Sequence, residues 1–194
     1  VEILKGNQSS VYGSGAIGGT INIITKKAEP GIKKNINYNT GSYGTQNLSL
    51  SYSAADENDN FFIGLERFQT DGMSAMTHND EKDAYRNNSL VANYSRQLSD
   101  QIEFKSNLRF ADTYSQYDKE IDTPTATHSE DTDVINSSSN VALVYKPNEK
   151  FTNNFTLANT YIKRRYNPAA GSGNTVKDNY YGERNALIYS GNYN

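Results

Sequence analysis

Apolar and polar side chains alternate with a period of two residues from Ile32 onward. In the clearest run one face carries Ile102, Phe104, Leu108 and Phe110, and the other carries Gln101, Glu103, Lys105, Asn107 and Arg109. This is the pattern of a half-buried β-strand, whose successive side chains point to opposite faces. Comparable runs predict eight strands, near residues 32–41, 47–54, 60–70, 86–98, 101–110, 134–146, 151–161 and 183–194.

The connections between these strands alternate between short and long. After a tight first turn at residues 41–44, short turns fall at 55–59, 99–100 and 147–150, and longer polar segments fall at 71–85, 112–133 and 167–182. An up-and-down meander with its long loops at one end is the layout of outer-membrane β-barrels. A soluble β-sandwich or a surface adhesin is the alternative, but several of the predicted strands exceed the usual length in globular proteins, about 5 to 6 residues.

The composition favours membrane strands over a large soluble core. Only 35% of the 194 residues are hydrophobic and the mean hydropathy is -0.79. No apolar run is long enough for a transmembrane helix, whereas 15 Tyr and 7 Phe suit strands with one lipid face and one wet face. The net charge of -3 argues against nucleic-acid binding, and the absence of Cys excludes a disulfide framework and a thiolate metal site.

Residues 1–27 differ from the rest of the chain in being rich in glycine. Gly13, Gly15 and Gly18 satisfy the G-x-G-x-x-G pattern of dinucleotide sites. That pattern requires a helix directly after the glycines, whereas residues 20–25 read TINIIT, a β-branched run typical of a strand. The acidic partner for the ribose is also missing from residues 31–55. The segment therefore predicts two strands joined by a glycine-rich loop, at the end of a larger packed domain.

Residues 1–27 resemble the end of the plug domain of TonB-dependent outer-membrane receptors. The matching positions are Glu2, Gly6, Ser9, Tyr12, Gly13, Gly15, Ala16, Gly18, Gly19, Ile21, Asn22, Ile23, Ile24, Thr25 and Lys26. Of these, the resemblance gives a structural role to Gly6, Tyr12, Gly13, Gly15, Gly18, Gly19 and Asn22. Lys5 stands where the family usually has Arg, and Asn7 where it usually has Pro; a Lys keeps the charge but loses the planar fork of Arg.

The resemblance implies two domains and an all-β fold. Residues 1–28 would be the C-terminal end of the plug, and residues 29–194 would be the N-terminal part of a plugged, antiparallel outer-membrane β-barrel, with about eight strands of its wall. Barrels of this family have 22 strands, so the chain is expected to be a fragment, truncated at both ends. Its place would be the outer membrane of a Gram-negative bacterium, in contact with outer-membrane lipid.

The function that the resemblance implies is active uptake of a scarce, bulky nutrient, driven by the TonB protein through a segment that precedes these residues. Cobalamin transporters are the most similar type, with ferric-siderophore and haem receptors as alternatives in the same family, and a passive porin or an adhesin as the alternative from a different class. Transport makes and breaks no bond, so we expect a non-enzyme without catalytic residues or a required cofactor. The two histidines, His78 and His128, have no catalytic or metal-ligand spacing.

Carboxylates recur in the predicted long loops, at Asp71, Asp80, Asp83, Asp118, Asp131 and Asp133. Calcium prefers such hard oxygen ligands. The resemblance to cobalamin transporters implies calcium bound in the second and third long loops, at Asp80, Asp83, Asp118 and Asp131. The alternative is that the acidic loops merely keep an exposed surface solvated. Convergence of four or more carboxylate oxygens on one point would favour calcium.

Overall fold

The computed structural model describes residues 2–7, 16–22, 28–74, 82–118, 129–168 and 177–193. Within these ranges every regular element is a β-strand. A two-stranded sheet of β1 (Glu2–Lys5) and β2 (Gly19–Asn22) is separate from a sheet of eight strands. No helix in the described ranges is long and apolar enough to cross a membrane.

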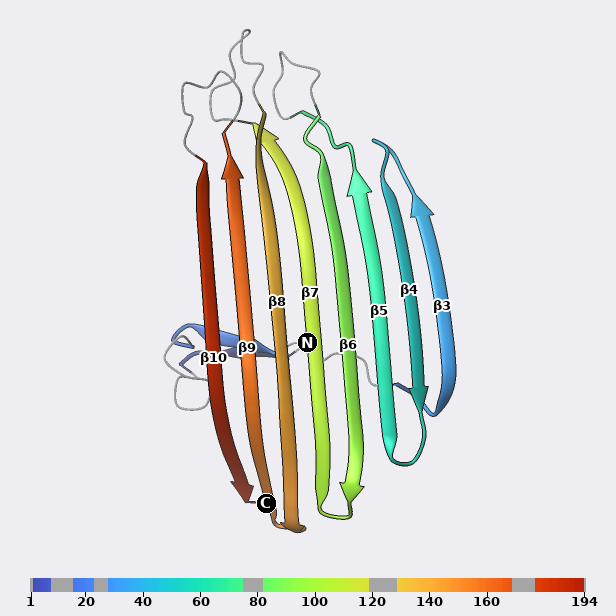
Figure 1. Cartoon of the computed structure of the whole chain (residues 1–194), viewed down its shortest axis with the longest axis vertical. Coiled ribbons are helices and arrows are strands. Elements are labelled where there is room, and N and C mark those ends of the chain that lie inside the picture. The colour runs from blue at the N-terminus through green and yellow to red at the C-terminus, as the bar shows by residue number, and fades with distance from the viewer. Residues whose placement is uncertain are drawn as a thin grey trace.

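The eight-stranded sheet is an antiparallel meander in which each strand pairs with its neighbour in sequence (Figure 1). Its strands are β3 (Gly31–Thr40), β4 (Gln46–Ala55), β5 (Asp59–Thr70), β6 (Tyr85–Ser99), β7 (Ile102–Asp118), β8 (Ser129–Asn148), β9 (Phe151–Asn167) and β10 (Asp178–Tyr193). This confirms the all-β fold and the strand order that the alternation predicts. It is also the arrangement expected of part of a barrel wall.

Local sequence explains the tight turns. The turn from β3 to β4 has Tyr43 and Gly44 at φ 58° and 66°, closed by a bond from the Thr45 amide to the Ser42 carbonyl at 3.1 Å, which is the geometry of a type I′ hairpin turn. At the other end of the sheet, the amides of Asp59 and Asn58 donate to the Asp56 carboxylate at 2.8 and 2.9 Å. These two bonds lower the pKa of Asp56.

Four strands are longer than the sequence pattern predicts, β9 among them because it continues to Asn167, so two of the long connections are shorter. β7 continues to Asp118, β8 begins at Ser129 and β10 begins at Asp178, whereas residues 112–133 and 167–182 were expected to be loops. In these extensions both faces carry polar side chains, which hides the alternation. The backbone ladder nevertheless continues to the pairs Asp118–Ser129 and Tyr166–Asp178, because ladder hydrogen bonds do not depend on side-chain polarity.

The register divides the sheet into two chemically different faces. One, called the outer face here, carries a continuous apolar band of Ile32, Ile36, Leu48, Leu50, Phe61, Ile63, Leu65, Leu90, Phe104, Leu108, Phe110, Val141, Leu143, Phe155, Leu157 and Leu187. Many of these large side chains are exposed. A broad exposed apolar surface of this kind is rare on soluble monomers but normal where lipid covers it.

Aromatic rings concentrate on the outer face near the short turns. Four contacts join Tyr52 with Phe61, Tyr94 with Phe104, Phe151 with Tyr193 and Phe155 with Tyr189, with ring centroids 4.9 to 6.2 Å apart. Such rings form the girdles of outer-membrane barrels at the level of the lipid headgroups. The apolar band therefore ends in an aromatic belt on this side.

The inner face is mixed, with polar side chains interspersed among apolar ones such as Phe62, Val91 and Val144. Asn107 donates to Asn140 at 2.9 Å, and Lys105 forms an ion pair with Glu103 at 3.1 Å. Near the short turns the Asn60 amide makes two bonds with the backbone of Ala28, at 3.0 and 2.8 Å. Ala28 is thereby held against the inner face.

The two-stranded unit has the strand–loop–strand order that the sequence predicts, with Lys5 opposite Gly19. Gly19 has φ 148°, and a Cβ there would lie 2.7 Å from the Leu4 carbonyl oxygen, so only glycine fits this close approach. Ile21 is 66% exposed, beside the exposed Ile3 on the neighbouring strand. A two-stranded unit has only one neighbouring strand to cover such side chains.

Arginine substitutions on β7 should separate the two faces. Leu108→Arg places a charge within the apolar band and is expected to lower the free energy of unfolding by ~2 to 4 kcal/mol, with a smaller loss for Phe104→Arg because it lies nearer the interface. Asn107→Arg, on the inner face, should cost less than either. Urea unfolding of the complete protein in lipid vesicles measures these differences. Equal losses at positions 107 and 108 would contradict a lipid-facing band.

Candidate functional site

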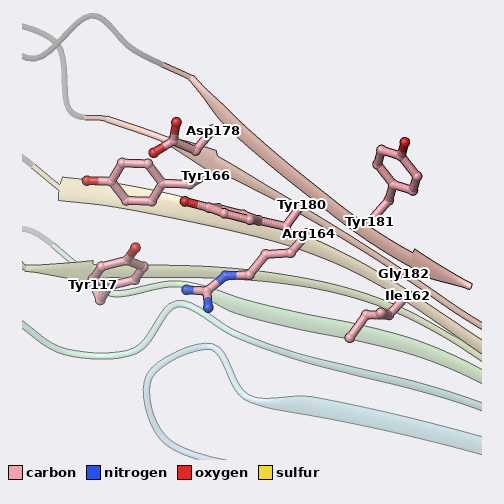
Figure 2. A pocket seen from close by; sticks show the side chains of 8 residues that line it. All are labelled: Tyr117, Ile162, Arg164, Tyr166, Asp178, Tyr180, Tyr181 and Gly182. Atoms are coloured by element: carbon pink, nitrogen blue, oxygen red, sulfur yellow. The ribbon is translucent and has the colours of Figure 1, made fainter.

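A cavity of about 630 Å³ opens on the inner face at the end of the sheet opposite the short turns (Figure 2). The strands β7, β9 and β10 contribute its lining, which consists of Tyr117, Ile162, Arg164, Tyr166, Asp178, Tyr180, Tyr181 and Gly182. Rings, a guanidinium and a carboxylate are the polar and aromatic groups that ligand sites use to orient what they bind. The cavity is therefore the candidate binding site of this chain.

The β9–β10 register explains how these side chains meet. Arg164 lies opposite Tyr180, Tyr166 opposite Asp178, and Ile162 opposite Gly182. All six are even-numbered, so they share the inner face. Tyr181, which follows Tyr180, points away from the other cavity residues (Figure 2). Arg164 points to the inner side of the sheet.

Two of the cavity tyrosines are held at their hydroxyls by buried side chains of β8. The Tyr117 hydroxyl lies 3.3 Å from Thr132 Oγ1, and the Tyr166 hydroxyl hydrogen-bonds Glu130. Thr132 and Glu130 are only 4% and 8% exposed. Tyr166 lies beyond the apolar band, and the bond to Glu130, followed by burial, raises its pKa to about 12. It therefore stays a protonated donor at physiological pH, satisfying the buried carboxylate.

Arg164 forms no ion pair with a carboxylate of the described part. The ion pairs among the described residues join Lys33 with Glu29, Lys82 with Asp71, Arg96 with Asp59, and Lys105 with Glu103. Arg164 takes part in none of them, although Asp178 lines the same cavity. Its guanidinium is exposed and carries donors in a planar fork suited to oxygen acceptors.

Gly182 provides part of the cavity's volume. A Cβ at this position would lie 3.3 Å from Ile162 Cγ2, so a larger side chain would occupy the space next to Ile162. The backbone of Gly182 does not have the positive φ that requires glycine. Space therefore accounts for this glycine better than backbone strain does.

The glycine-rich motif is placed only in part. Gly6 has φ 90° and its amide donates to the Gly18 carbonyl at 3.3 Å, while Gly19 and Asn22 bound β2. Tyr12, Gly13 and Gly15 lie outside the described residues. The structural role that the resemblance gives these residues, and the division at residue 28, stay predictions.

The acidic residues do not all lie in loops, contrary to the expectation. Asp71 and Asp83 do lie between β5 and β6, and Asp71 pairs with Lys82 at 3.0 Å. Asp118 ends β7 and Asp131 lies within β8, as does Asp133. The register puts these three on the outer face, away from the cavity.

Calcium binding stays a prediction. Among the described residues no three acidic or histidine side chains are grouped so that they could hold a metal ion. Asp80, which belongs to the expected ligand set, lies outside these residues, as do His78 and His128. The described carboxylates therefore give no support of their own to a calcium site.

The cavity residues were missed by the sequence pattern because they lie in the strand extensions assigned to loops. Tyr117 and Tyr180 fall within the segments expected to be long loops, and Arg164 and Tyr166 fall beyond the expected end of their strand. A signal was present: inner-facing Tyr166 and Tyr180 continue the two-residue period set by Ile162 and Gly182. It was masked by equally polar neighbours.

The chain is similar to two curated transporters. It is 26% identical over 180 residues to the vitamin B12 transporter BtuB of Photobacterium profundum, covering 91% of this chain and 29% of the relative. It is 29% identical over 126 residues to the vitamin B12 transporter BtuB of Vibrio vulnificus, covering 61% of this chain and 20% of the relative. The chain thus spans less than a third of the length of either, and no protein-family model matches it.

These similarities support a relation to TonB-dependent receptors. They also agree with the expectation that the chain is not an enzyme, since both relatives are named as transporters. The all-β meander and its apolar outer face are compatible with the outer membrane.

The support beneath Tyr117 can be tested by removing one hydroxyl. Thr132→Val keeps the shape of the buried side chain but deletes the partner of Tyr117, and should lower the free energy of unfolding by about 0.5–1.5 kcal/mol. Thr156→Val, on the inner face of β9, is the matched control. Urea unfolding of both variants in lipid vesicles checks the difference. A loss no larger than that of the control would mean that Thr132 does not hold the ring.

Proposed function

We propose that the complete protein takes up cobalamin, a scarce and bulky nutrient, across the outer membrane with energy from the TonB protein. The observation that carries the proposal is the two-faced sheet, apolar toward lipid and more polar toward the inside, with a tyrosine-lined cavity at the end away from the short turns. The choice of substrate rests on the two relatives, both of which are vitamin B12 transporters. Outer-membrane barrels have their long loops outside the cell, so this end of the wall would meet the nutrient first.

In this proposal residues 1–28 are the end of a plug, and residues 29–194 are part of the barrel wall. The bonds between Asn60 and Ala28 support it, because they hold Ala28, at the proposed junction, against the inner face. TonB would act through a segment of the complete protein outside these residues. The cavity would contact the nutrient before the plug rearranges.

Uptake by cells tests this function directly. The complete protein, produced in a Gram-negative strain without its own cobalamin receptor, should restore accumulation of radiolabelled cyanocobalamin only when TonB is present. TonB-dependent uptake of a ferric siderophore or haem instead would show that the protein is an active transporter with a different substrate. TonB-independent leakage of small solutes would identify a passive porin and refute the proposal.

The cavity's part in this function can be tested by filling it. Gly182→Val should lower cyanocobalamin affinity about tenfold, equivalent to about 1.4 kcal/mol, because the new side chain takes space beside Ile162. Gly64→Val is the control, since a Cβ there also meets a neighbouring side chain at 3.3 Å but lies on β5, away from the cavity. Equilibrium binding to outer-membrane vesicles measures both. Equal affinities for the two variants would remove the cavity from the binding surface.

A further inference from the structure

The cavity on the inner face contains one cationic and one anionic side chain that form no ion pair with each other. Arg164 lies opposite Tyr180, and Asp178 lies opposite Tyr166, so the two charged residues are diagonal neighbours across β9 and β10, with Cα atoms about 7–8 Å apart. The ion pairs of the described residues include neither of them. In Figure 2 the Arg164 guanidinium points toward Tyr117, and the Asp178 carboxylate lies on the far side of Tyr180.

Aromatic surface lies next to this pair of charges. Tyr180 is exposed, and Tyr117 is held at its hydroxyl by the buried Thr132, so both offer ring surface to a bound molecule. The Tyr166 hydroxyl already bonds Glu130. The polar groups left for a ligand are therefore chiefly the donors of Arg164 and the acceptor oxygens of Asp178.

We propose that Arg164 and Asp178 form a subsite for a carboxamide group carried on a bulky, ring-containing ligand. The amide oxygen would accept from Arg164, and the amide NH₂ would donate to Asp178, while the ligand's apolar body packs against Tyr117 and Tyr180. A carboxamide is neutral and offers both functions at once.

Charged alternatives fit this pair less well. A carboxylate or phosphate on the ligand would satisfy Arg164 but would face both Asp178 and Glu130, and a like-charge approach of this kind is unfavourable. An ammonium group would satisfy Asp178 but would be repelled by Arg164. A neutral group with a donor and an acceptor avoids both penalties.

The inference rests on the proposed function, because cobalamin carries primary carboxamides around the edge of its planar ring system. It goes beyond that function in assigning one chemical group of the ligand to two residues. Hydrogen bonds in which one partner is charged are stronger than those between neutral groups. Loss of either charged partner should therefore weaken binding about tenfold or more.

The sheet supplies a matched pair of control positions. Arg165 and Asp133 are directly opposite each other on β9 and β8, on the outer face. They are the same two residue types as the cavity pair, but they lie on the face of the sheet that does not face the cavity. Arg165→Gln and Asp133→Asn therefore control for changes of charge and strand stability.

The experiment measures equilibrium binding of cyanocobalamin to the complete protein in outer-membrane vesicles. Arg164→Gln and Asp178→Asn should each weaken binding about tenfold, and the outer-face variants should match the wild type. Asp178→Asn is decisive: tighter or unchanged binding would overturn the carboxamide assignment, and tighter binding would indicate an anionic group instead. Tighter binding by Arg164→Gln would likewise overturn it in favour of a cationic group.

A second set of probes keeps the assignment falsifiable if a variant folds poorly. The probes are cobalamins with one peripheral carboxamide hydrolysed to a carboxylate, and at least one of them should bind the wild type more weakly than cyanocobalamin does. The difference in affinity between that derivative and cyanocobalamin should be smaller for Asp178→Asn. Equal binding of every derivative to the wild type would overturn the subsite. If the wild type binds no cyanocobalamin, the proposed function fails and this inference fails with it; if it binds but the cavity variants match their controls, only the inference fails.

Discussion

The unbroken antiparallel ladder from β3 to β10 is the constraint on which the rest of the structure depends. Successive side chains on a strand alternate between faces, so a shift of one residue in register would exchange the two faces entirely. The register keeps Leu108 with Ala92 and Ser139, and Asn107 with Asn93 and Asn140. The apolar band, the more polar inner face and the position of the cavity all follow from that one register.

The cavity depends on the ladder continuing past the apolar band. In β9 the outer face is apolar at Phe155 and Leu157, and polar from Lys163 onward. There the strand no longer has an apolar face to bury, and its pairing with β8 is maintained by backbone hydrogen bonds and by cross-strand contacts such as Asn167 with Asp131. The same extension that removes the hydrophobic signal brings Arg164 and Tyr180 together.

This explains how far the sequence predicts the molecule. Where one face is apolar, as from Ile102 to Phe110, the two-residue period gave the strand, its face and the short turns beside it. Where both faces are polar, at Tyr117 and at Asp178, the period is invisible and the strands were cut short. The glycine-rich segment was informative for a different reason: the backbone geometry at Gly19 excludes other residues, so its pattern reflects conformation directly.

The same register decides which face each aspartate lies on, including those that were expected to lie in loops. Asp118 and Asp131 are diagonal neighbours on β7 and β8, but the register directs them outward, so no movement of the connecting loop would turn their strand positions toward the cavity. Asp178, by contrast, is brought to the inner face by the register, where it lines the cavity. It is held there by a ladder that is complete before any ligand arrives, so binding need not order the strands first. A wall built in this way is preorganised, and preorganisation lowers the entropic cost of binding.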